Sequence, residues 1–95
     1  MRLREDPIDL SYREGFDAEA FLALAQRIWP REYSLTDAAA ALERTINIGV
    51  WHGSRLVGSI RVLTDGYFYA TIPDIFVDPQ YQRRGIGRRL MELAL

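Results

Sequence analysis

The stretch that decides the fold is "IFVDPQYQRRGIGRRLMELAL", residues Ile75–Leu95. It starts with an apolar run typical of a strand, passes through Asp-Pro into two glycines set among arginines, and ends with the beginning of an amphipathic helix. The N-terminus of a helix presents unpaired backbone N–H groups and a partial positive charge, and glycine lets a ligand approach those amides closely. With the arginines added, the stretch predicts an anion site, most naturally for phosphate or pyrophosphate.

Length and composition indicate one small globular domain. The chain has 95 residues, of which 48% are hydrophobic and 26% charged, and its formal net charge is −1. It has no cysteine and a single histidine, His52, so we expect no disulfide, no thiol nucleophile and no metal. No apolar run approaches the ~20 residues of a membrane span, and the charged N-terminus lacks the apolar core of a signal peptide. We therefore expect a cytoplasmic protein without a membrane partner.

The pattern of apolar residues predicts the order β-α-α-β-β-β-α, an α+β fold with a mostly antiparallel sheet. Glycine turns at 53–54 and 65–66 separate the three later strands, and Pro73 predicts a break in pairing just before Ile75. The expected elements are a strand over Ile8–Gly15, a helix capped by Asp17 that stops before Pro30, a helix capped by Ser34, strands over Ile48–His52, Leu56–Leu63 and Tyr67–Val77, and a helix that opens near Gly85.

Three phosphate-binding motifs can be compared with the glycine turn. The phosphate loop of nucleotide hydrolases needs a lysine, and this chain has none. The dinucleotide motif G-x-G-x-x-G would need its third glycine at position 90, which is Leu90. In contrast, "QRRGIG" (Gln82–Gly87) matches the Gln/Arg-x-x-Gly-x-Gly/Ala signature of the GNAT superfamily of acetyl-CoA-dependent N-acetyltransferases. The preceding "IFVDPQYQ" resembles the strand end that leads into that signature, and the order of elements extends the resemblance over the whole chain.

The resemblance implies a GNAT-like mixed sheet with helices on both sides and acetyl-CoA as the cofactor. In this family the amides of the signature loop hold the coenzyme A pyrophosphate, and the end of the preceding strand hydrogen-bonds the pantetheine arm. The cofactor-binding residues implied here are Ile75, Phe76, Val77, Gln82, Arg83, Arg84, Gly85, Ile86, Gly87 and Arg88. The family fold continues into a fifth strand that this sequence lacks, so we expect residues 1–95 to form a partial domain, truncated before that strand.

Candidates for catalysis and acceptor binding are fewer. Asp74 is the only carboxylate near the expected slot on the last strand, so it is the candidate base or ammonium anchor; the alternative is a solvated strand residue. Trp29 and Tyr33 lie between the first two helices, a region that shapes the acceptor site in the family, although packing in the core or at its rim would also explain them. His52, beside a hairpin turn, is expected to be a surface residue. The arginines at 83–89 could also form a solvated face, in which Arg88 and Arg89 pair with Glu92.

Three functions compete on these grounds. The first is transfer of an acetyl group from acetyl-CoA to a primary amine by direct attack in a ternary complex, with a small-molecule or peptide acceptor. The second is a catalytically incomplete module that binds coenzyme A or assembles with a partner chain, for example as a homodimer through the exposed last strand. The third, nucleic-acid binding through the arginines, is disfavoured by the net charge of −1.

Overall fold

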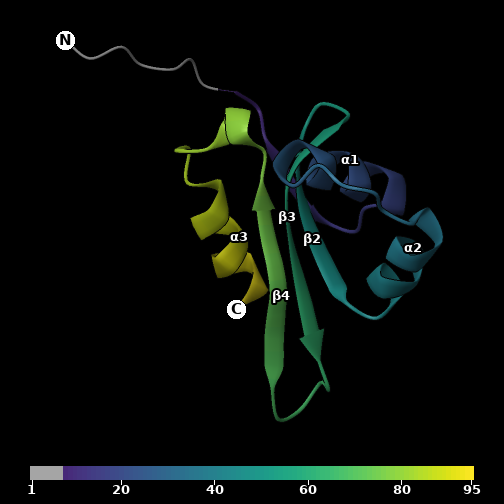
Figure 1. Cartoon of the computed structure of the whole chain (residues 1–95). Helices are drawn as coiled ribbons and strands as arrows, with labels where there is room; N and C mark the ends of the chain where they lie inside the picture. Colours follow the sequence, from purple (N-terminus) through teal and green to yellow (C-terminus); the bar gives the residue numbers. More distant parts are fainter. Residues whose placement is uncertain (1–7) are drawn as a thin grey trace.

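The computed structural model describes residues 8–95, which form a four-stranded antiparallel sheet in the order β1-β2-β3-β4 with helices on both faces (Figure 1). Helices α1 and α2 cover one face, and α3 covers the other (Figure 1). The order of elements confirms the predicted α+β fold. The elements are β1 (Ser11–Glu14), α1 (Ala18–Ile28), α2 (Leu35–Glu43), β2 (Ile46–His52), β3 (Arg55–Thr64), β4 (Ala70–Val77), a short 3-10 helix η1 (Pro79–Tyr81) and α3 (Ile86–Ala94).

The two predicted helix caps are both present. The Asp17 carboxylate accepts a hydrogen bond from the Ala20 amide at 2.8 Å, and the Ser34 hydroxyl accepts one from the Asp37 amide at 3.1 Å. Each bond satisfies an amide that has no partner inside its helix. Helix α1 ends at Ile28, directly before Trp29 and Pro30, because proline cannot continue the backbone hydrogen-bond pattern.

The last strand is shorter at its start than the sequence predicts. Strand β4 begins at Ala70 rather than Tyr67, because the Asp65 carboxylate accepts hydrogen bonds from the amides of Tyr67, Phe68 and Tyr69 at 2.8–3.3 Å. These bonds hold the three aromatic residues in the turn that joins β3 and β4. The first strand is also shorter than expected, since pairing with β2 extends only over Ser11–Glu14.

Pro73 does interrupt strand pairing, as predicted. Arg61 of β3 pairs with Asp74 of β4, whereas Leu63 pairs with Thr71, so β4 has one residue more than β3 over this interval. Proline has no N–H to donate to the ladder, so it fits at such a bulge, which also bends the strand locally. Within the described residues β4 is an edge of the sheet, and its outer side has no partner strand.

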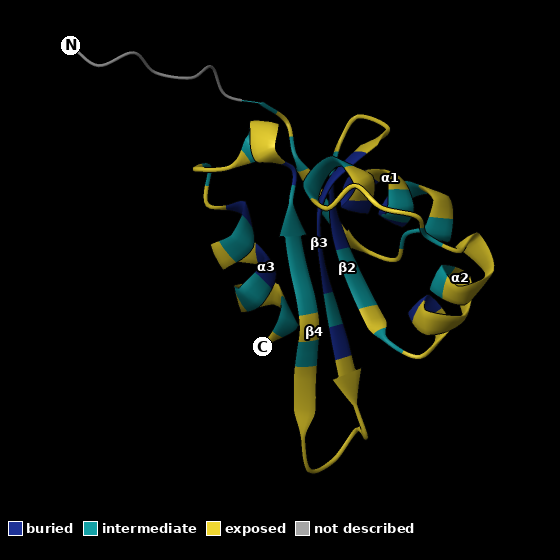
Figure 2. Ribbon diagram, in the orientation of Figure 1, coloured by how far each residue is buried: buried dark blue, intermediate teal, exposed yellow. Residues whose placement is uncertain are grey.

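Two apolar layers hold the sheet between its helices. On one face, Ile86 and Leu90 of α3 pack into a fully buried cluster with Val50, Val57 and Ile60. On the other face, the Phe21 ring of α1 stacks on Phe16 and Phe76, with ring centroids 5.5 and 5.7 Å apart. Figure 2 shows that buried residues concentrate where the helices cover β2 and β3, while the far end of the β3–β4 hairpin is exposed.

Packing of Val50 from β2 and Ile86 from α3 against β3 requires a glycine at position 58. A Cβ there would lie 2.5 Å from Val50 Cγ1 and 3.1 Å from Ile86 Cγ2. We expect Gly58→Ala to lower the free energy of unfolding by about 2 kcal/mol, because the added methyl group overpacks this contact. Urea denaturation followed by circular dichroism measures the loss.

Gly87→Ala is the matched control for that substitution. Its Cβ would meet only Val77 Cγ2, at 4.0 Å, which is an ordinary contact. Alanine also favours the helix over glycine by roughly 0.5–1 kcal/mol, so this variant should be slightly more stable than the natural chain. Equal midpoints for the two variants would contradict the packing argument.

Candidate functional site

The loop between β4 and α3 has a backbone shaped to expose its amides. Arg83 and Gly85 both adopt left-handed conformations, with φ of 67° and 78°. Helix α3 begins directly after Gly85, which is its N-cap and supplies no side-chain hydrogen bond. For Arg83 this conformation costs roughly 1–2 kcal/mol, a strain more common at functional loops than elsewhere. The first turn of α3 thus keeps amides that no side-chain cap occupies.

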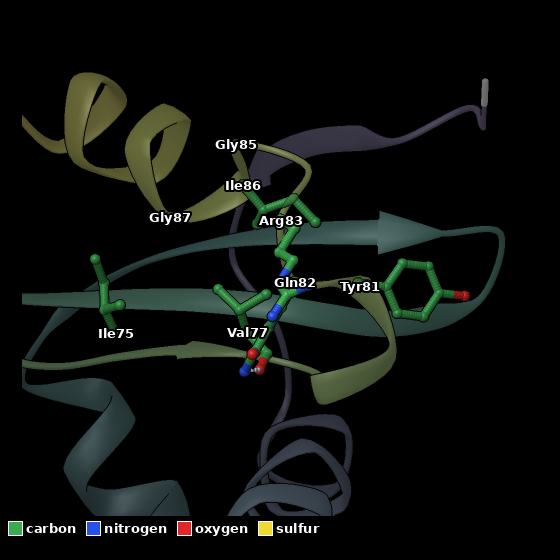
Figure 3. A pocket seen from close by; sticks show the side chains of 8 residues that line it. All are labelled: Ile75, Val77, Tyr81, Gln82, Arg83, Gly85, Ile86 and Gly87. Carbon is green, nitrogen blue, oxygen red and sulfur yellow. Dashed lines mark hydrogen bonds between the residues drawn. The ribbon is translucent and has the colours of Figure 1, made fainter. Parts of the chain in front are cut away.

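A cavity of about 320 Å³ lies beside this loop, between the end of β4 and the first turn of α3 (Figure 3). Figure 3 shows the Ile75 and Val77 side chains rising from β4 on the side of α3. The lining residues are Ile75, Val77, Tyr81, Gln82, Arg83, Gly85, Ile86 and Gly87. The cavity therefore gathers most of the residues expected to bind the cofactor. Of those expected residues, Phe76, Arg84 and Arg88 do not line it.

Phe76 points the other way because neighbouring residues of a strand face opposite sides of the sheet. Its ring stacks on Phe21 and meets the Trp29 ring edge to face, with centroids 6.4 Å apart. Only the main chain of Phe76 is therefore available beside Ile75 and Val77. The Phe76 side chain belongs to a second cavity.

This second cavity has a volume of about 430 Å³ and lies on the α1 and α2 side of β4. Its lining includes Trp29, Tyr33 and Asp74, the three residues that the sequence singled out for acceptor binding and catalysis. The Tyr33 hydroxyl donates a hydrogen bond to the Trp29 carbonyl at 2.8 Å, which fixes the segment between the helices. Trp29 is 65% exposed, so it forms the rim of the cavity and is not a core residue.

Asp74 is engaged by an arginine of the neighbouring strand. Arg61 Nη2 lies 2.6 Å from Asp74 Oδ2, and Arg61 Nε lies 3.0 and 3.1 Å from the two carboxylate oxygens. Both side chains are more than four-fifths buried. Asp74 is therefore not the freely solvated residue of the alternative interpretation.

Asp78 is a residue whose importance the sequence reasoning missed. It is 1% exposed, and its carboxylate accepts hydrogen bonds from Arg27 Nε at 2.7 Å, Arg55 Nη2 at 3.1 Å and the Gln80 amide at 2.9 Å. Its own amide donates to the Val57 carbonyl at 2.8 Å. These bonds connect α1 and β3 to η1, the segment that leads from β4 into the loop. The Asp-Pro pair after the strand was the available signal, because aspartate commonly caps a helical turn that proline starts.

The charge of Asp78 should make the fold sensitive to acid. Burial raises the pKa of Asp78, but the hydrogen bond from the Gln80 amide and the guanidinium groups of Arg55 and Arg27 together lower this pKa below its ordinary value of 3.8. The unfolded chain therefore takes up a proton first as the pH falls. The stabilisation is complete above pH of about 4 and is lost as the pH falls through the folded pKa.

The measurement is a series of urea unfolding curves between pH 6 and pH 2. We expect the natural chain to lose more free energy of unfolding over this range than Asp78→Asn, which has no carboxylate to titrate at this position. Parallel losses in the two proteins would show that Asp78 does not contribute to the acid transition.

Tyr81, which lines the first cavity, is a second residue to which the sequence reasoning assigned no role. Its hydroxyl lies 2.6 Å from Nδ1 of His52. His52 is exposed, as expected, but it has this specific partner. The predicted pairing with Glu92 is present for Arg89, whose Nη1 lies 3.4 Å from Glu92 Oε1.

Residues 8–95 contain no group of three histidine, aspartate or glutamate side chains placed to hold a metal ion. Among the same residues, no helix is long and apolar enough to cross a membrane.

Comparison with known proteins identifies the family. The family model described as "Acetyltransferase (GNAT) family" matches residues 10–95. The chain therefore belongs to the GNAT acetyltransferase family, in agreement with the resemblance carried by the glycine signature. The probable acetyltransferase TAP2 of Glycine max is 34% identical over 95 residues, and the histone acetyltransferase TAP1 of the same plant is 36% identical over 96 residues. Each match covers 85% of this chain but only 38% and 41% of the respective relative.

Solved structures share the fold. A GNAT-family protein of Streptococcus pneumoniae superposes with a TM-score of 0.78 and 29% identity over 92% of this chain and 66% of its own. The ribosomal-protein-S18-alanine N-acetyltransferase of Escherichia coli superposes with a TM-score of 0.75 and 26% identity over 90% of this chain and 57% of its own. The aminoglycoside N-acetyltransferase AAC(6')-Iy, solved in complex with CoA, has a TM-score of 0.69 over 96% of this chain and 70% of its own; at 16% identity it supports the fold alone.

Proposed function

We propose that this chain carries the coenzyme-binding part of an acetyl-CoA-dependent N-acetyltransferase that acetylates a primary amine. The observation that carries the proposal is the cavity between β4 and α3, where a helix start without a side-chain cap meets the end of a strand. Backbone amides over 82–88 would bind the pyrophosphate, and the positive end of the α3 dipole would favour its charge. Arg84 and Arg88 belong to the same loop and first turn and would add positive charge there.

The pantetheine arm would lie along Ile75, Phe76 and Val77. Since β4 is an edge within the described residues, its outer main-chain groups are available to an extended ligand, much as they would be to another strand. The bulge at Pro73 lies just before this segment and would bend the strand away at the point where the thioester ends.

The acceptor would occupy the second cavity, on the other side of β4. Trp29 and Tyr33 would form its wall, and Asp74 would anchor the ammonium group or take its proton. The neutral amine would attack the thioester carbonyl and form the C–N bond, the C–S bond would break, and the proton lost by the amine nitrogen would balance the proton taken up by the thiolate of the leaving coenzyme. Strand amides would stabilise the negative charge that develops on the carbonyl oxygen.

The open edge of β4 favours a second candidate function. The chain would then either assemble with a partner chain, such as a second copy, through this edge, or bind coenzyme A without turning it over. Size-exclusion chromatography together with an assay of free-thiol release separates the two functions. The cytoplasmic location and the absence of a nucleic-acid partner stay predictions from the sequence.

The test of coenzyme binding is a calorimetric titration of the 95-residue chain with coenzyme A and, separately, with pantetheine. Pantetheine lacks the pyrophosphate, so we expect it to bind at least roughly tenfold more weakly, a difference of about 1.4 kcal/mol. Added salt should weaken coenzyme A binding and leave pantetheine binding unchanged. Equal affinities for the two ligands would remove the anion site from the proposal.

Turnover is tested by thiol release from acetyl-CoA with a panel of amines. The names of the similar proteins suggest two acceptors for this panel, a peptide with an N-terminal alanine and a histone-tail peptide, and a small-molecule amine represents the other acceptor class. Release with one acceptor class and not with the others would define the substrate. Coenzyme A binding without release from any of them would support the second candidate function.

A further inference from the structure

The β2–β3 hairpin contacts η1, the short helix between β4 and α3, at two points. His52 ends β2 and Arg55 starts β3, and the two residues face each other across the turn. The Arg55 guanidinium bonds to the carboxylate of Asp78, which caps η1, and Nδ1 of His52 lies 2.6 Å from the hydroxyl of Tyr81, the last residue of η1. Both ends of η1 are thus fixed to the β2–β3 hairpin.

Tyr81 is the last residue of η1 and lies directly before the loop that is proposed to bind the pyrophosphate. Its amide donates to the Asp78 carbonyl at 2.8 Å, and its ring packs against the buried cluster under α3 while lining the first cavity. The loop starts at the next residue, Gln82, and reaches the N-cap of α3 only three residues later, at Gly85. Because so few residues separate the two points, a change in the position of Tyr81 moves the loop amides directly.

We propose that His52 and Tyr81 are positioning residues for coenzyme binding, and that their hydrogen bond sets the geometry of the amides over 82–88. This inference rests on the proposed function of the first cavity. The hydroxyl donates to Nδ1 when the neutral imidazole carries its proton on Nε2, and it accepts from Nδ1–H in the other tautomer or in the protonated ring. The rings also meet edge to face at 5.5 Å, which limits the positions that Tyr81 can take.

The test is a double-mutant cycle of Tyr81→Phe and His52→Ala, with the dissociation constant of coenzyme A as the readout. Tyr81→Phe keeps the ring and its packing but removes the hydroxyl. We expect each single variant to weaken binding about fivefold, which corresponds to one hydrogen bond, and the double variant to be no weaker than either single variant. His52→Asn keeps a hydrogen-bonding group at the same distance along the side chain as Nδ1 and should restore most of the affinity.

Tyr12→Phe is the matched control. Tyr12 is also a partly buried tyrosine that packs against the same cluster, but it lies on β1, away from the first cavity. Its hydroxyl should contribute nothing to coenzyme A affinity. Unchanged affinity in Tyr81→Phe would overturn the inference, and so would additive losses in the double variant.

A second measurement needs no ligand. The NMR order parameters of the backbone amides over 82–88 in the free chain should be lower in Tyr81→Phe and His52→Ala than in the natural chain, and unchanged in Tyr12→Phe. If the natural chain does not bind coenzyme A, the proposed function fails, and the order parameters still decide whether this hydrogen bond positions the loop. Equal order parameters in all the variants would overturn that role.

Discussion

Asp78→Ala should lower the free energy of unfolding by about 3 kcal/mol, a large share of the stability of a domain of this size. The variant leaves the Arg27 and Arg55 guanidinium groups without their shared carboxylate and removes the cap of η1. Losing one partner of a buried ion pair typically costs 3–5 kcal/mol. The lower end applies here, because Arg27 and Arg55 are 25% and 45% exposed and partly recover hydration. Urea denaturation measures the loss.

Glu92→Ala serves as the matched control, since it also removes one carboxylate from an arginine. Arg89 and Glu92 lie 3.4 Å apart and are both more than half exposed, so this variant should lose less than about 0.5 kcal/mol. Asp78→Asn keeps an oxygen for the Gln80 amide and should lie between the two. If Asp78→Ala were as stable as Glu92→Ala, the buried carboxylate and its bonds to Arg27 and Arg55 would not stabilise the fold.

Gly85→Glu should weaken coenzyme A binding by about 100-fold, equivalent to about 2.7 kcal/mol. Two unit charges about 5 Å apart near a protein surface repel by roughly 3 kcal/mol, and the new carboxylate would stand where the pyrophosphate is expected. The φ of 78° at Gly85 also disfavours any side chain at this position, although nothing lies within 4 Å of the added Cβ. Calorimetry with coenzyme A gives the affinity of the variant.

Gly66→Glu reproduces both the strain and the charge at a distant place. Gly66 has φ of 81°, an added Cβ would meet nothing within 4 Å, and the residue lies in the turn between β3 and β4. Gly66→Glu should lose about as much stability as Gly85→Glu and should keep the affinity of the natural chain for coenzyme A. If both variants bound coenzyme A as the natural chain does, the anion site would not be at the start of α3.

The elements with strong local signals could be predicted from the sequence alone. Asp17 and Ser34 cap helices, turns form at glycine-containing dipeptides, and Pro73 marks the bulge. Each of these effects depends on only a few neighbouring residues, so it could be predicted. The predicted start of β4 at Tyr67 was wrong, because the Asp65 carboxylate accepts hydrogen bonds from three amides of an otherwise strand-like aromatic run. That competition is local too, but propensity alone does not show which structure the run prefers.

The site was predictable only as far as its sequence motif extends. The glycine signature predicted a binding loop whose residues include several that line the first cavity. Ile75 and Val77, predicted to bind the pantetheine arm through their main chain, line the same cavity. The partners of Asp78 and Tyr81 are far away in the chain, at Arg27, Arg55 and His52, and no spacing rule connects residues across a sheet. The bond between Arg61 and Asp74 was missed for the same reason, since it depends on the register of β3 and β4.

Alternation along β4 has a consequence for engineering and for evolution. Ile75 and Val77 face one cavity, while Asp74 and Phe76 face the other. Under the proposed function, one strand separates the donor from the acceptor, so substitutions at every second position would change only one of them. A new acceptor preference could therefore arise by substitution of Phe76 while the donor keeps its affinity, which makes this strand a natural place to diversify specificity.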